Sequence, residues 1–98
     1  MTGIIQHKGY QLAGELRDFS QAEYETYHRV MRELVRKEDT AANTNGAVVR
    51  AAVKAGFLTL DGNPDVGTLS PGAVVWLLEK VHNHVTAITT PLKEDDPN

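Results

Sequence analysis

The stretch from Ser70 to Thr89 constrains the fold most, because it is the longest strongly apolar run and contains the only tryptophan of the 98-residue chain. Ser70 suits the N-cap position of a helix, and Pro71 suits the first helical position, where a missing N–H has no cost. At about 100° per residue, six apolar side chains fall within one arc narrower than about 120°. They are Val74, Leu77, Leu78, Val81, Val85 and Ile88. We therefore predict a long C-terminal helix with a core-facing stripe.

Trp76 lies outside this stripe. The same helical spacing places it on nearly the opposite side, in a group with Ala73, Lys80 and Asn83. Trp76 either packs beneath another element, because a tryptophan buries a large area, or contacts a protein partner, because tryptophan is enriched at binding hot spots. Both interpretations stay open. The candidate partner-binding residues are Trp76, Ala73, Lys80 and Asn83.

Residues 4–12 predict a short β-hairpin with its turn at Lys8-Gly9. Gly9 would supply the positive φ that a tight turn needs, and residues 13–18 would be connecting chain. A two-stranded hairpin alone is marginally stable in water. We therefore expect the hairpin to pack on the helices or to pair with a partner strand.

The clearest local signal marks the start of a helix that runs from Gln21 to about Lys37. Ser20 and Glu23 have the S-x-x-E spacing of a capping box, in which each side chain bonds the backbone N–H of the other residue. Phe19 and Tyr24 have the spacing of a hydrophobic staple at the same helix end.

The polar residues 38–45 predict a loop, followed by a short helix capped by Thr44 or Asn45. This helix would end at Ala55, with Gly56 at the C′ position, where the left-handed conformation is common. Its core-facing residues would be Val48, Val49, Ala52 and Val53.

The pattern of these elements predicts the fold class. The chain is long enough for one domain, and its 41% hydrophobic and 23% charged content are ordinary for a globular protein. We expect a single α+β, mostly helical domain over residues 1–90, in which a short N-terminal β-hairpin precedes three helices and the C-terminal helix is central. Residues 91–98 hold two prolines and three consecutive acidic residues, and predict a disordered acidic tail.

Cysteine is absent, so the chain can form no disulfide, no cysteine-ligated zinc site and no thiol nucleophile. The C-terminal apolar stretch is interrupted by charges and histidines, which argues against a membrane span, and the N-terminus lacks the apolar core of a secretory signal. We therefore expect a cytoplasmic protein without membrane contact. The formal net charge of −3 argues against nucleic acid as the main partner.

His82 and His84 suggest a metal or nuclease site at first sight. On a helix, however, residues two apart point about 200° away from each other, so the two imidazoles cannot share one metal. Neither histidine has a histidine or carboxylate four residues away, and no GxSxG or glycine-rich phosphate loop occurs. We expect both histidines at the surface or rim, and no enzyme activity, metal or cofactor.

Residues 58–69 predict a turn-rich connection. Within it, residues 61–65 (DGNPD) place oxygen ligands at the first, third and fifth positions of a calcium loop. The sixth position is Val66 instead of glycine, and the twelfth is Gly72 instead of glutamate. We therefore interpret the segment as a turn.

Five basic side chains on the first two helices could form a patch for nucleic acid or an acidic protein. They are Arg29, Arg32, Arg36, Arg50 and Lys54. Two observations favour a solvated helix face instead. The loop over residues 38–45 is too long for a helix-turn-helix, and acidic residues four positions earlier compensate Arg29 and Lys37.

The order of these motifs resembles a known family. Its elements are a KGY turn at residues 8–10, a capped helix beginning FSxxEY at residues 19–24, VVRAAVKAGFL at residues 48–58 and DVGxLSPxxVxWL at residues 65–77. The chain resembles small phage and prophage proteins of the tail assembly chaperone type. This resemblance implies a non-enzymatic protein that binds a tape measure protein and can oligomerise, with no catalytic residues.

The leading hypothesis is therefore a protein-binding module that makes contact through Trp76. The rival is a small nucleic-acid-binding regulator that uses the basic helix face. A third possibility, an accessory subunit of an enzyme, has no sequence feature that separates it from the first.

Overall fold

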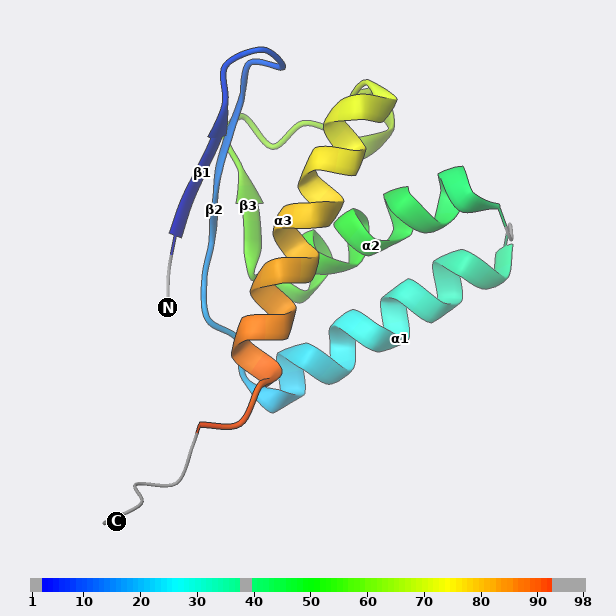
Figure 1. Ribbon diagram of the computed structural model, residues 1–98. Coiled ribbons are helices and arrows are strands. Elements are labelled where there is room, and N and C mark those ends of the chain that lie inside the picture. Colours follow the sequence, from blue (N-terminus) through cyan, green and yellow to red (C-terminus); the bar gives the residue numbers. More distant parts are fainter. Residues whose placement is uncertain (1–2, 38–39, 93–98) are drawn as a thin grey trace.

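The computed structural model describes residues 3–37 and 40–92. Its elements are, in chain order, β1 (Gly3–His7), β2 (Leu12–Leu16), α1 (Gln21–Lys37), α2 (Ala41–Ala55), β3 (Leu58–Leu60), the 3₁₀ helix η1 (Val66–Thr68) and α3 (Pro71–Thr89). The predicted fold class is confirmed: the domain is α+β and mostly helical, with an N-terminal hairpin followed by three helices. Figure 1 shows the sheet along one side, α3 beside it, and α1 and α2 side by side in opposite directions.

The sheet is antiparallel throughout, in the order β1-β2-β3. In the hairpin, Gly3 pairs with Leu16 and His7 pairs with Leu12. Ile5, Leu12 and Leu16 are buried on the face that joins the core. The hairpin therefore packs on the helices, as its marginal stability alone required.

Two strand predictions were wrong. Residues 13–16 belong to β2 and are not connecting chain, and β3 lies within residues 58–69, where we expected only turns. The segment AGEL at 13–16 is poor in strand-forming residues. In β3, the buried Leu58 and Leu60 flank the exposed Thr59, which is the two-residue alternation of a strand, but three residues are too few to stand out in the sequence.

The hairpin turn also differs from the prediction. Gln11 has the positive φ, at 53°, whereas Gly9 does not. Gln11 N donates to Lys8 O at 3.1 Å, which closes a four-residue loop over residues 8–11. In such loops a left-handed residue follows the turn and restores the strand direction. The left-handed position therefore falls at the end of the loop and not at its glycine.

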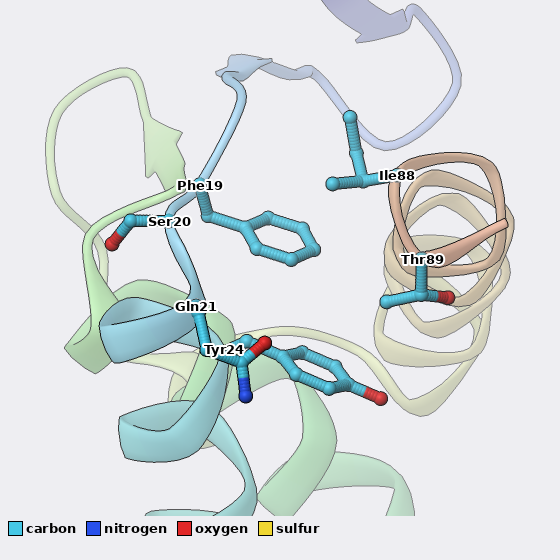
Figure 2. Close-up of a pocket in the computed structure, with 6 residues that line it drawn as sticks. All are labelled: Phe19, Ser20, Gln21, Tyr24, Ile88 and Thr89. Atoms are coloured by element: carbon cyan, nitrogen blue, oxygen red, sulfur yellow. The ribbon is translucent and has the colours of Figure 1, made fainter. Parts of the chain in front are cut away.

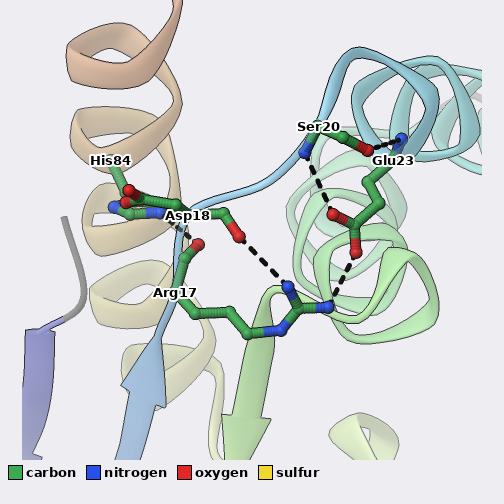
Figure 3. A network of polar contacts seen from close by, with 5 residues as sticks. All are labelled: Arg17, Asp18, Ser20, Glu23 and His84. Carbon is green, nitrogen blue, oxygen red and sulfur yellow. Dashed lines mark hydrogen bonds and ion pairs between the residues drawn. The ribbon is translucent and has the colours of Figure 1, made fainter.

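The start of α1 is as predicted. Ser20 N donates to Glu23 Oε1 at 3.0 Å, and Glu23 N donates to Ser20 Oγ at 3.2 Å, so the capping box is complete (Figure 3). The rings of Phe19 and Tyr24 stack with centroids 5.7 Å apart and form the expected staple.

Helix α2 begins earlier than predicted. Thr40 is its N-cap and its Oγ1 accepts from Asn43 N at 3.1 Å, so residues 41–45 are helical and the proposed caps Thr44 and Asn45 were wrong. The Asn43 side chain donates to Leu34 O of α1 at 2.9 Å. This contact satisfies a polar side chain inside the helix pair. The polar composition of residues 41–45 is therefore compatible with a helix and did not indicate a loop.

The end of α2 is as predicted, because Gly56 adopts the left-handed conformation with φ 92° and its N–H bonds the last turn. Val48, Val49 and Ala52 are buried as expected, but Val53 is 42% exposed, so its assignment to the core was wrong. Helix α2 has more buried residues than α3 and contacts α1, α3, β3 and η1. Helix α2 therefore supplies more buried residues than α3, whereas Leu77 and Val81 of α3 are among the largest fully buried side chains.

Helix α3 starts as predicted, with Ser70 Oγ accepting from Ala73 N at 3.3 Å and Pro71 in the first turn. Its fully packed line is Ala73, Leu77 and Val81, so the stripe is rotated relative to the predicted one. The other predicted stripe residues are only partly buried: Val74, Leu78, Val85 and Ile88. The rotation brings the helix face with Trp76 toward the hairpin. Of the predicted tail, residues 93–98 lie outside the described residues.

Candidate protein-binding surface around Trp76

Trp76 lies beneath the end of the hairpin. Its side chain is partly buried and packs against the core cluster. Its ring also meets the ring of His7, at the end of β1, in an edge-to-face contact with centroids 5.1 Å apart and planes at 82°. Trp76 therefore combines internal packing with partial exposure, so the structure contains features of both interpretations from the sequence.

Tyr10 joins this cluster from the hairpin turn. Its ring lies 4.5 Å from that of His7, and its backbone N donates to His7 Nδ1 at 3.3 Å. The Tyr10 hydroxyl covers Gly72 in the first turn of α3, where a side chain would collide with it. Tyr10 is nevertheless 41% exposed. The turn is thus docked on α3 while it presents an aromatic ring to solvent.

Lys80 completes the cluster one turn after Trp76. Its Nζ lies 5.7 Å from the centroid of the Trp76 ring, within cation–π distance. We call His7, Tyr10, Trp76 and Lys80 the aromatic surface. Its groups are aromatic faces and one ammonium, which suit contact with apolar and acidic groups of another protein.

The structure unites only part of the predicted site. Trp76 and Lys80 are in contact, but Ala73 is 2% exposed and belongs to the core, so its assignment to the surface was wrong. Asn83 is exposed and lines a separate depression of about 390 Å³ with Leu78, Glu79 and His82. Sequence reasoning missed His7 and Tyr10. The sequence signal that could have indicated them is Tyr10, an aromatic residue directly after the predicted turn glycine Gly9.

A second hollow lies between the start of α1 and the end of α3 (Figure 2). It has a volume of about 480 Å³ and is lined by Phe19, Ser20, Gln21, Tyr24, Ile88 and Thr89. The stacked rings of the hydrophobic staple form one wall, and Ile88 lies across the hollow on α3. None of the described residues that line the hollow is charged.

A polar network fastens the β2–α1 connection (Figure 3). Arg17 Nη2 bonds Glu23 Oε2 at 2.7 Å, and Arg17 Nη1 donates to Asp18 O at 3.1 Å. The backbone N–H of Ser20 and the Arg17 guanidinium both bond the Glu23 carboxylate, and they hold its pKa below the ordinary value. The network stabilises the charged form of Glu23 at the helix start.

His84 joins α3 to this connection. Its Nε2 lies 2.8 Å from Arg17 O. Since a carbonyl oxygen only accepts, Nε2 carries the proton of this hydrogen bond. The ring also contacts Phe19 and Phe57. His84 is thus a structural contact, whereas His82 is exposed, as expected for a surface residue.

The arginines of α1 and Arg50 of α2 line different depressions. Arg29, Arg32 and Arg36 are exposed on α1 and, with Glu33, line a depression of about 170 Å³. We call these three arginines the basic stripe. Arg50 lines a different cleft, of about 250 Å³, between α2 and the start of α3. The expected compensation is not seen, because among the described residues no ion pair joins Arg29 to Glu25 or Lys37 to Glu33.

Metal-ligating groups do not converge in the described part of the chain, where no three His, Asp or Glu residues lie close enough to hold an ion. Residues 61–65 form a turn, with φ of 81° at Gly62 and 47° at Asn63, and Asp65 Oδ1 accepts from Gly67 N at 3.3 Å at the start of η1. The carboxylate that resembled a calcium ligand therefore caps a helix.

None of the helices in the described ranges is long and apolar enough to cross a membrane. Comparisons of the chain with protein-family models, curated proteins and solved structures found no match.

Proposed function

We propose that the protein is a cytoplasmic, non-enzymatic protein-binding module whose contact is the aromatic surface. The observation that supports this proposal is the position of Trp76, which is anchored in the core yet leaves part of its ring exposed beside Tyr10 and Lys80. A ring held in place by packing loses little side-chain entropy on binding. Such preorganised aromatic residues are typical binding hot spots.

The resemblance to tail assembly chaperones supports a narrower proposal, in which the partner is a tape measure protein. In that complex the aromatic rings would cover apolar side chains of the partner, and Lys80 would pair with its acidic ones. Binding would then protect the partner without any covalent chemistry.

Titration of the protein with helical tape-measure fragments, followed by calorimetry, tests this proposal. Trp76→Ala should raise the Kd by about 30-fold or more, because hot-spot truncation costs about 2 kcal/mol and each 1.4 kcal/mol is tenfold. Leu92→Ala is the matched control, since Leu92 is apolar and 95% exposed but lies in the chain after the C-terminal end of α3. Absence of binding, or equal affinity of the Trp76→Ala variant, would contradict the proposal.

A specific observation keeps the nucleic-acid hypothesis as a second candidate. The three guanidinium groups of the basic stripe are exposed, and no described acidic side chain pairs with them. If they bind phosphates, affinity should fall steeply with salt, and Arg32→Glu with Arg36→Glu should abolish binding in a mobility-shift assay. No shift at low salt would exclude this function.

A further inference from the structure

Two hydrogen bonds beside the sheet show which backbone groups of β2 face β3. Arg17 N donates to Phe57 O at 2.9 Å, and Asp61 N donates to Ala13 O at 2.9 Å. Along an antiparallel strand, hydrogen bonding alternates between the two neighbours. The odd-numbered residues of β2 therefore bond β3, and its even-numbered residues bond β1.

The same alternation fixes the outer side of β1. The even-numbered residues of β2 stand opposite Gly3, Ile5 and His7, so these three residues direct their backbone groups toward β2. Ile4 and Gln6 consequently direct their N–H and C=O groups away from the sheet. No described strand pairs with them. We call this side of β1 the free edge.

Within the described part of the chain, the free edge lacks the charges, prolines and covering elements by which proteins normally protect an edge strand. The strand GIIQH holds no lysine, acidic residue or proline, and Ile4 is 83% exposed. The opposite edge is different: β3 has three residues, Leu60 O accepts from Asn63 N at 3.0 Å, and α2 packs against the strand. Figure 1 shows β1 on the side of the sheet away from α1 and α2.

We propose that β1 pairs with β1 of a second copy of this chain, antiparallel and symmetric about Ile5. In this register Ile4 stands opposite the partner's Gln6, and the two residues exchange both of their backbone N–H···O=C bonds. The two-fold symmetry forms the same pair a second time, between Gln6 and the partner's Ile4. All five residues of the strand take part, with Gly3 opposite the partner's His7. The two sheets would join into one of six strands.

Side chains favour a second copy as the occupant. The two Ile4 side chains meet diagonally across the new strand pair on the open face of the sheet, which covers the apolar group that is most exposed in the strand. The strand carries no charge that would oppose its own copy. This contact involves a different surface from that of the proposed function and does not depend on it.

Sedimentation equilibrium of the full chain, from low micromolar to millimolar concentration, tests the proposal. A contact of one strand pair is small, so we expect a weak, concentration-dependent dimer of twice the 10.8 kDa chain mass. Gln6→Pro removes one outward N–H from each copy without removing a bond to β2. It should raise the dimer Kd about tenfold or more, whereas Gln6→Thr keeps the N–H and should dimerise as the wild type does.

Ile4→Lys provides a second variant, because it places a charge on each side of the symmetric contact while it keeps every backbone group. Circular dichroism checks that each variant is folded. A wild-type protein that stays monomeric at millimolar concentration would overturn the proposal. So would a dimer that survives both Gln6→Pro and Ile4→Lys, because another surface would then join the copies. An extended peptide that binds the monomer with Kd raised by Gln6→Pro would assign the edge to a different occupant.

Discussion

Replacement of Leu77 by alanine tests the position of the core most directly. Leu77 is 0% exposed and lies in the middle of the packed line of α3. The substitution removes about three methylene equivalents, which at about 0.8 kcal/mol each amounts to about 2.4 kcal/mol of lost burial. A cavity that does not collapse adds about 24 cal/mol per Å³. We therefore expect a loss of about 2.5–4 kcal/mol, from a total stability of about 5–15 kcal/mol.

Urea unfolding followed by circular dichroism measures this loss of stability. In thermal unfolding, the midpoint temperature should fall by about 10–30 °C. Leu78→Ala is the matched control, because Leu78 is the next residue of the same helix and is only partly buried. It should cost about half as much. If Leu78→Ala costs as much as Leu77→Ala, the stripe has the orientation that the helical spacing predicted, and the observed rotation of α3 is refuted.

Three further substitutions test local features. A side chain at Gly14 would collide with Thr59 O of β3, so Gly14→Ala should cost about 1–3 kcal/mol, whereas Gly3→Ala has open space and should be neutral in the same unfolding assay. Ser20→Ala removes an acceptor of the capping box and should cost about 0.5–2 kcal/mol by thermal unfolding. Glu23 has a folded-state pKa below its ordinary value, so its charge stabilises the fold above the unfolded pKa and this contribution is lost as pH falls through the folded one. Glu23→Gln should therefore be less stable than the wild type at neutral pH. The difference should shrink as pH falls below the ordinary glutamate pKa of about 4.3 and vanish below the lowered folded-state pKa. A difference that stays constant with pH would exclude the charge of Glu23 as its cause.

The features that sequence reasoning predicted correctly are those whose partners are close in the chain. Ser20 and Glu23 are three residues apart, and Gly56 adjoins the helix that it ends. Such signals depend on local backbone geometry and need no knowledge of the fold. The start of α2 was missed because Asn43 is held by a bond to Leu34, nine residues away on another helix. The amino-acid composition of residues 38–45 does not predict that contact.

The position of Trp76 has the same explanation and decides how its role can be measured. Its contact with His7 joins residues 69 positions apart and exists only because the hairpin docks on α3. Since the ring packs against the core and is also partly exposed, Trp76→Ala must reduce stability as well as binding, and loss of binding alone cannot assign the surface. Lys80 resolves this ambiguity. It is exposed, so Lys80→Ala should change the free energy of unfolding by less than about 0.5 kcal/mol. A weaker partner affinity in that variant would therefore report the contact itself.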